Sequence, residues 1–245
     1  MHACARVIVA LSIAVGLVAA TGGCVSGEGN PPPEWLPGGP AQQQAPDPDA
    51  PPAPEGAHGH GTEVFMMGRS VMAGWFESWG YDHTSPVLRD GFALYYHEVP
   101  GPPDIGTDAA AAVANLPPGT IVFFKLCFVD FSPGNAEENL GYVRQVLDAC
   151  EARGLTLVVG NALPQVRGAS TPELADTHLA YNAGLEQMAA GSDTMAVFDL
   201  YSLLAGQDGT LPVGLAVSPD DSHLNHVAYS VLDEAFFEFL AGLQP

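Results

Sequence analysis

The fold is decided by residues 64–70, which read Val-Phe-Met-Met-Gly-Arg-Ser. The run from Val64 to Gly68 carries no polar side chain, which is typical of a parallel strand covered on both faces. The glycine ends the strand, and Ser70 opens a segment with helical character. A serine at such a turn lies beside a helix N-terminus, where backbone amides can stabilise a developing negative charge. A serine that only caps the helix would give the same local pattern.

The strand-to-helix pattern recurs along the rest of the chain. Helices are predicted from the cap at Asn135 to Gly154, from Thr171 onward, and from about Leu224 to the C-terminus. Further apolar runs predict strands at residues 93–99, 120–128, 155–160 and 195–199. This alternation predicts a three-layer α/β/α sandwich with a five-stranded, mostly parallel sheet. Active groups are then expected beyond the C-terminal ends of the strands.

The N-terminal region predicts export. Residues 7–20 form an uncharged apolar run after Arg6, too short for a membrane span and suited to a signal peptide. Residues 19–24 resemble a bacterial lipoprotein cleavage site, which predicts a signal peptide at 1–23 and a lipid on Cys24. Thr21 stands where leucine is usual, so ordinary secretion is the alternative. Residues 24–61 are rich in Pro, Gly and Gln and predict a disordered spacer.

These boundaries leave residues 62–245 as one folded domain, held through a lipid at a bacterial cell envelope. The formal charge of −21, with seven Lys and Arg, argues against nucleic acid as a partner. Phosphate loops, dinucleotide fingerprints and zinc motifs are absent from the sequence, so neither a cofactor nor a metal is expected. Cys127 and Cys150 remain in the domain, where a disulfide and two free thiols are both open.

A second group of reactive residues lies at 219–225, Pro-Asp-Asp-Ser-His-Leu-Asn. In a loop before the last helix, Asp220 and His223 can meet across one turn, and the carboxylate would hold the imidazole in one tautomer. Together with Ser70 these residues supply a nucleophile, a base and an orienting carboxylate.

The two end segments resemble those of the SGNH, or GDSL-type, hydrolase family. Residues 68–70 with Gly74 resemble the family's first block, and residues 220–225 followed by Ala228-Tyr229 resemble its last block. The resemblance covers about residues 62–243. It implies that family's flavodoxin-like fold, with Ser70 as nucleophile, His223 as base and Asp220 as the orienting acid. Asp221 is the competing candidate for the acid, but its offset of two from the histidine does not match the family's Asp-x-x-His.

The chain departs from the family pattern at two places. Arg69 replaces the usual aspartate, and residues 125–130, Lys-Leu-Cys-Phe-Val-Asp, stand in place of a Gly-x-Asn-Asp block. The family asparagine donates to the oxyanion, and loss of one such donor costs about 10²–10³ in rate. Asn161 and Lys125 are the candidate replacements. The family's second-block glycine is expected at Gly106, with Gly101 as the alternative.

The sequence therefore predicts a cofactor-free serine esterase that acts on a carbohydrate or other small acyl ester. Two alternatives remain: a non-catalytic binding lipoprotein with the same fold, and an acyltransferase that uses the same triad. The missing asparagine block favours the non-catalytic reading. The presence of serine, aspartate and histidine in register favours the enzyme.

Overall fold

The computed structural model describes residues 61–83 and 86–243. The predicted signal peptide, Cys24 and the spacer up to residue 60 lie outside the described residues. Helices and strands alternate along the domain as the sequence predicts. In chain order they are β1 (Thr62–Gly68), α1 (Ser70–Ser78), β2 (Val87–Arg89), β3 (Phe92–Glu98), α2 (Ile105–Val113), β4 (Ile121–Lys125), a 3-10 turn (Phe128–Asp130), α3 (Ala136–Arg153), β5 (Thr156–Gly160), α4 (Pro172–Ala190), β6 (Met195–Phe198), α5 (Leu200–Leu204), β7 (Ala216–Ser218), β8 (Asp221–Leu224) and α6 (His226–Gly242).

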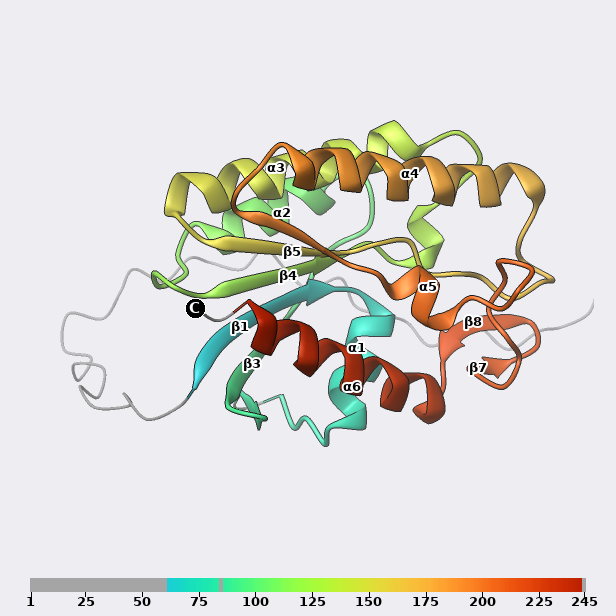
Figure 1. Cartoon of the computed structure of the whole chain (residues 1–245), viewed down its shortest axis with the longest axis horizontal. Coiled ribbons are helices and arrows are strands. Elements are labelled where there is room, and N and C mark those ends of the chain that lie inside the picture. The colour runs from blue at the N-terminus through green and yellow to red at the C-terminus, as the bar shows by residue number, and fades with distance from the viewer. Residues whose placement is uncertain (1–60, 84–85, 244–245) are drawn as a thin grey trace, which may run out of the picture. The chain divides into compact units, whose positions relative to one another are not determined.

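The central sheet has the strand order β2-β3-β1-β4-β5-β6 (Figure 1). The five predicted strands form its parallel part, and β2, which the sequence did not reveal, adds an antiparallel edge strand. The order of the parallel strands is that of flavodoxin-like folds, which bind ligands where the strand order reverses. Here that place is the C-terminal end of β1, because β1 lies between β3 and β4. The predicted α/β/α architecture is confirmed.

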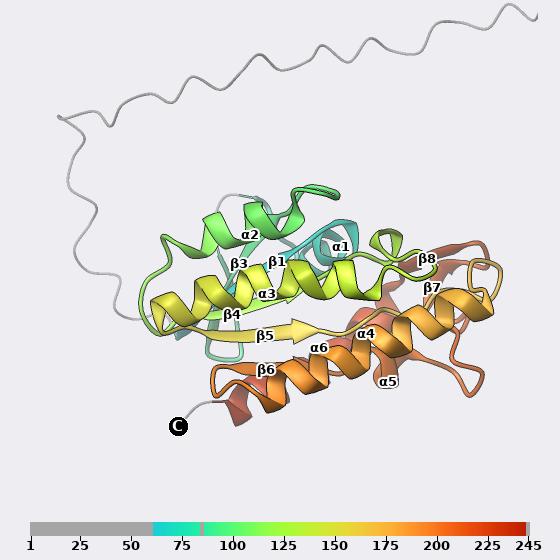
Figure 2. The same ribbon diagram turned by 90° about the horizontal axis from the view of Figure 1, so that it is seen from above.

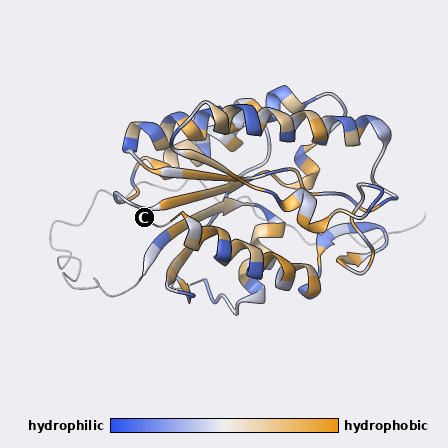
Figure 3. Ribbon diagram, in the orientation of Figure 1, coloured by the Kyte–Doolittle hydropathy of each residue, from blue (hydrophilic) through white to orange (hydrophobic). Residues whose placement is uncertain are grey.

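Helices α2, α3 and α4 cover one face of the sheet, and α1 and α6 cover the other (Figures 1 and 2). Each face has its own apolar core, because successive residues of a strand point to opposite sides. Met66 belongs to the core under α1 and α6, whereas Met67 belongs to the core under α2 to α4. Phe123 and Phe124 divide in the same way. Figure 3 shows the resulting apolar strands between helices of mixed polarity, which explains the continuous apolar runs in the sequence.

The ends of the long helices follow from local chemistry. Gly154 ends α3 with φ of +64°, a conformation that favours glycine. The Thr171 hydroxyl accepts the Leu174 amide at the start of α4. The last helix begins at His226 rather than near Leu224, because the Asn225 side chain caps it. The preceding residues form β8, which pairs with β7 as a separate two-stranded ribbon.

Gly74 allows α1 and α6 to approach closely. A Cβ at this position would lie 2.4 Å from the hydroxyl oxygen of Tyr229. That hydroxyl donates to the Val71 carbonyl at 3.0 Å, so the two helices are joined by a buried hydrogen bond. The contact fixes the first turn of α1, which carries Ser70, against the helix that follows β8.

Cys127 and Cys150 are both buried free thiols. Cys127 follows β4, whereas Cys150 lies in α3, where burial raises the pKa of its thiol to about 12. Within residues 61–83 and 86–243, none of the helices combines the length and apolar character that crossing a membrane requires.

Candidate active site

Ser70 stands at the N-terminus of α1, two residues after the end of β1. The Arg69 carbonyl accepts the amides of Met72 and Ala73, which fixes the first turn of the helix. Ser70 is exposed to solvent, so a substrate can reach its hydroxyl. The turn between β1 and α1 therefore presents its hydroxyl at the C-terminal edge of the sheet.

The structure brings Ser70 and His223 together from opposite ends of the domain. The Nε2 atom of His223 lies 2.9 Å from the Ser70 hydroxyl oxygen. On the other side of the ring, Nδ1 lies 2.6 Å from a carboxylate oxygen of Asp221. The three side chains thus form one continuous hydrogen-bonded chain of serine, imidazole and carboxylate, which is the arrangement of a serine nucleophile with its base.

The carboxylate on His223 is that of Asp221, which corrects the expectation of Asp220. The expectation assumed a loop leading into a helix, but residues 221–224 form strand β8. Side chains two positions apart share one face of a strand, so Asp221 and His223 point the same way. Asp220 is exposed in the turn before β8, where its backbone amide donates to the Ser218 hydroxyl.

Asp221 is held in its ionised form. The backbone amide of His223 donates to the same Asp221 oxygen at 2.9 Å, and this bond, with the ring contact, lowers the pKa of the carboxyl. A carboxylate acceptor keeps the proton on Nδ1, which leaves Nε2 free to accept the Ser70 proton. The Phe128 ring meets the imidazole edge-on with centroids 5.0 Å apart, which limits the orientations open to the ring.

A second set of contacts surrounds Ser70 on the side of β4. The Cys127 sulfur lies 3.7 Å from the Ser70 hydroxyl oxygen. Asp130 accepts the Cys127 backbone amide at 2.8 Å through one oxygen and Arg69 Nη1 at 2.5 Å through the other. The Asp130 side chain is 1% exposed, so the ion pair is anchored below the surface. Both parts of this set stand out in the sequence, because Arg69 and residues 125–130 depart from the pattern that the end segments resemble.

The three residues expected at the oxyanion serve other purposes. Lys125 is buried, and its ammonium donates to the Leu126 carbonyl at 2.9 Å. Burial lowers the pKa of this amine. The Asn161 amide nitrogen donates to Asp199, and its oxygen accepts the Tyr201 amide, so this side chain fixes the start of α5.

Gly106 lies in the first turn of α2 and packs against α3, where a Cβ would come within 2.8 Å of the Gln145 side chain. Gly101, the alternative, lies near the guanidinium of Arg69 instead. A Cβ there would be 3.7 Å from Arg69 Nη1. Of the two glycines, Gly101 is the one that lies against the residue preceding Ser70.

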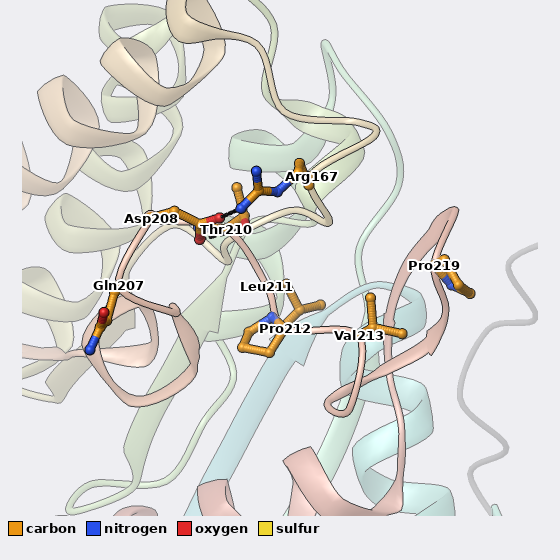
Figure 4. Close-up of a pocket in the computed structure, with 8 residues that line it drawn as sticks. All are labelled: Arg167, Gln207, Asp208, Thr210, Leu211, Pro212, Val213 and Pro219. Carbon is orange, nitrogen blue, oxygen red and sulfur yellow. Dashed lines mark hydrogen bonds and ion pairs between the residues drawn. The ribbon is translucent and has the colours of Figure 1, made fainter.

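A hollow of about 650 Å³ opens beside the ribbon that carries the base (Figure 4). Arg167 points across it to Asp208, with which it forms an ion pair. Pro219 contributes to its wall and precedes Asp221 by two residues. None of its eight lining residues belongs to the group around Ser70, so the hollow adjoins the base ribbon rather than the nucleophile.

No protein-family model and no curated protein matches the sequence. Solved structures share the fold. A GDSL-like lipase from Bacteroides thetaiotaomicron has a TM-score of 0.57 at 15% identity, over 75% of this chain and 89% of that one. A member of the lipolytic G-D-S-L family from Veillonella parvula has a TM-score of 0.56 at 15% identity, over 74% and 100%. A carbohydrate acetylesterase from Sinorhizobium meliloti has a TM-score of 0.50 at 16% identity, over 75% and 100%.

Proposed function

We propose that this domain, which has the fold of the GDSL and SGNH hydrolases, is a serine ester hydrolase that works through an acyl-enzyme. One observation carries the proposal. The Ser70 hydroxyl, both ring nitrogens of His223 and the Asp221 carboxylate form a hydrogen-bonded chain with separations of 2.9 and 2.6 Å. This order of groups is what general-base activation of a serine requires.

In the first half of the reaction, Ser70 attacks the carbonyl carbon of the ester while His223 Nε2 takes the hydroxyl proton. The imidazolium that forms is stabilised by Asp221, which stays ionised. Collapse of the tetrahedral intermediate breaks the bond to the alcohol oxygen, and His223 returns its proton to that oxygen. The alcohol leaves, and the acyl group stays on Ser70.

In the second half, a water molecule replaces the alcohol. His223 accepts a proton from this water as it attacks the acyl carbon, and then donates the proton to the Ser70 oxygen as the acid is released. Because Ser70 is exposed, water and small acceptors have direct access to the acyl-enzyme. An alcohol acceptor in place of water would give acyl transfer with the same residues.

A carbohydrate ester or another small acyl ester is the substrate class we favour. Ser70 is exposed, so an ester of a short acyl group with a large or polymeric alcohol can approach it. A serine at the end of a deep tunnel would exclude such an alcohol. One protein with the same fold is a carbohydrate acetylesterase. The predicted export and lipid attachment at Cys24 would bring the domain to glycans of the cell envelope.

A non-catalytic binding protein is the second candidate. It is favoured by a specific observation: Asn161 and Lys125, the expected replacements for the family asparagine, are both engaged elsewhere. A domain without an oxyanion donor beside its serine would retain the fold and bind esters without turning them over efficiently.

The test is labelling of the purified protein with a fluorophosphonate, together with release of p-nitrophenol from p-nitrophenyl acetate. Wild type should label once and hydrolyse the ester, and Ser70→Ala and His223→Ala should do neither. Ser230→Ala is the matched control, because among the described residues that exposed hydroxyl bonds only the His226 carbonyl of its own helix. A folded wild type that neither labels nor hydrolyses would favour the binding protein, and labelling that survives Ser70→Ala would exclude Ser70 as nucleophile.

A further inference from the structure

We propose that Arg69 donates to the ester oxygen as it becomes an oxyanion, and that Asp130 positions Arg69 for this task. The inference rests on the proposed function, because it assigns a role in the same reaction. In this proposal a charged side chain donates to the oxyanion, in place of the neutral side-chain amide that the SGNH hydrolases use.

The first argument is the place of the guanidinium. Strand β1 lies between β3 and β4, so the segments after these two strands flank the turn that carries Ser70. Gly101 belongs to the segment after β3, and Asp130 to the segment after β4. The Arg69 guanidinium lies between them: Nη1 is 2.5 Å from Asp130, and a Cβ added to Gly101 would lie 3.7–3.8 Å from three guanidinium atoms. The cation therefore lies across the end of β1, one residue from the nucleophile.

The second argument is donor capacity. A guanidinium has five N–H donors in a fixed plane and no acceptor. Within the part of the chain that the structure describes, its side-chain hydrogen bond is made to Asp130 through Nη1. The Arg69 side chain is 29% exposed, whereas that of Asp130 is 1% exposed. One end of the guanidinium is thus fixed by a buried carboxylate, and the rest reaches the solvent side, where a substrate would lie.

The third argument is the state of the competing donors around Ser70. The Cys127 backbone amide is engaged by Asp130. The Cys127 thiol, 3.7 Å from the serine oxygen, is a weak donor. Hydrogen bonds from a charged donor are about twice as strong as neutral ones. A fixed guanidinium can therefore supply what the missing amide would supply, without reorganising during the reaction.

The experiment compares Arg69→Met, Arg69→Lys and Asp130→Asn in the purified protein, with kcat and KM for p-nitrophenyl acetate as the readout. Arg144→Met is the matched control, because that arginine is also paired with a carboxylate, Glu137, but lies on the exposed face of α3. We expect Arg69→Met to lower kcat by about 10²–10³ with KM changed by less than about threefold. Arg69→Lys should recover about tenfold of that loss and so remain at least about tenfold below wild type in kcat, because an ammonium lacks the planar set of donors.

Asp130→Asn separates a catalytic role of Arg69 from a structural one. If Arg69 only holds Asp130, the two single variants should lose activity equally and KM should rise with the loss. We expect Asp130→Asn to lose less than Arg69→Met, about tenfold in kcat, because the arginine remains but is less well fixed. Should Arg69→Met fail to fold, Arg69→Lys decides: a kcat within about twofold of wild type would overturn the inference, and a fall of about tenfold at unchanged KM would support it.

The outcomes distinguish this inference from the proposed function. Hydrolysis that Ser70→Ala abolishes but a folded Arg69→Met retains within about threefold would overturn the role of Arg69 and leave the esterase intact. A folded wild type without Ser70-dependent labelling or hydrolysis would overturn the proposed function, and the role of Arg69 with it.

Discussion

On one side of Ser70, the base and its carboxylate come from residues two positions apart on one short strand, whereas on the other side the contacts join residues 57 and 61 positions apart. The first side, with Asp221 and His223, is called the base side below. The second, with Arg69, Cys127 and Asp130, is called the β4 side. The orientation of His223 by Asp221 follows from the period of a strand, although His223 itself meets Ser70 across 153 positions. The contacts of Arg69 and Ser70 on the β4 side form only when β1 and β4 are assembled. The two sides should therefore respond differently to mutation and to pH.

The largest expected effect is on the base side. Asp221→Asn should lower kcat/KM by about 10³–10⁴, because an amide no longer enforces the tautomer that leaves Nε2 free or stabilises the imidazolium. Asp220→Asn changes the neighbouring residue in the same way and should stay within about threefold of wild type. Hydrolysis of p-nitrophenyl acetate measures both. A larger loss from Asp220→Asn would show that the orienting acid lies three residues before His223 after all.

The next effect concerns the stability of the folded protein at low pH, and it arises next to the β4 side. Phe131 follows Asp130 directly and packs edge-on against His178, with ring centroids 4.9 Å apart. Burial lowers the pKa of His178 from 6.5 to about 4. Below about pH 6.5 the unfolded chain binds a proton that the folded protein does not, so stability falls as the pH falls. The loss is about 1.4 kcal/mol for each pH unit and up to about 3 kcal/mol near pH 4.

Urea unfolding of wild type and His178→Phe at pH 7.5, 5.5 and 4.5 tests this. The Phe variant does not titrate, and the replaced Nε2 atom is buried without a hydrogen-bond partner among the described residues. The variant should therefore lose less stability than wild type as the pH falls, whereas His226→Gln, at an exposed site, should follow wild type. Parallel loss in wild type and His178→Phe would mean that other groups cause the acid sensitivity.

A third effect tests the contact between α1 and α6, which supports the base side. Gly74→Ala would bring a Cβ within 2.4 Å of the Tyr229 hydroxyl, and such overpacking should lower the free energy of unfolding by about 2 kcal/mol. Tyr229→Phe removes the clashing oxygen but also the hydrogen bond to Val71, which costs about 1 kcal/mol by itself. The double variant should thus be more stable than Gly74→Ala alone. Chemical unfolding measures the cycle, and strictly additive losses would argue against this contact.

The smallest effect is expected at Lys125. Removing a buried charge is often neutral or stabilising, so Lys125→Met should leave the free energy of unfolding unchanged or raise it by about 1 kcal/mol near pH 7. Burial lowers the pKa of the amine, so the folded protein releases its proton at a lower pH than the unfolded chain. Wild type should therefore gain stability relative to the variant as the pH rises toward about 10. Unfolding at pH 7 and pH 9.5 measures this difference.

The same variant sharpens the assignment on the β4 side. Because the Lys125 ammonium donates to the Leu126 carbonyl, kcat should change by less than about threefold. A loss of about 10² or more at unchanged KM would make Lys125 the oxyanion donor and remove the need for Arg69.

The sequence predicted the parallel strands and long helices well, because their apolar runs and helix caps are local signals. It did not reveal β2 or β7, each only three residues long. It read residues 220–223 as the mouth of a helix, and this error exchanged Asp221 for Asp220. A strand and a helical turn place different neighbours beside a histidine, and four residues carry too little periodicity to separate them.

The β4 side could not be derived from the sequence, because its partners are far apart in the chain. Arg69 was recognised as a departure from the family and Asp130 as part of a replaced block. Their pairing depends on the order of β1, β3 and β4 in the sheet. The resemblance to the family's second block indicated Gly106, and the end of a strand indicated Asn161. In the structure, Gly106 packs against Gln145, and Asn161 bonds to Asp199 and Tyr201.

The base is carried on a ribbon of two strands that is not part of the main sheet. The Ser222 hydroxyl, which accepts the Val166 amide, joins this ribbon to the segment between β5 and α4. Two-stranded ribbons are marginally stable by themselves, and native proteins open first where few groups hold the backbone. Amide hydrogens of β7 and β8 should thus exchange with solvent before those of β4 and β5. On warming, His223 would leave Ser70 while the sheet is still intact, so inactivation would precede unfolding and reverse on cooling.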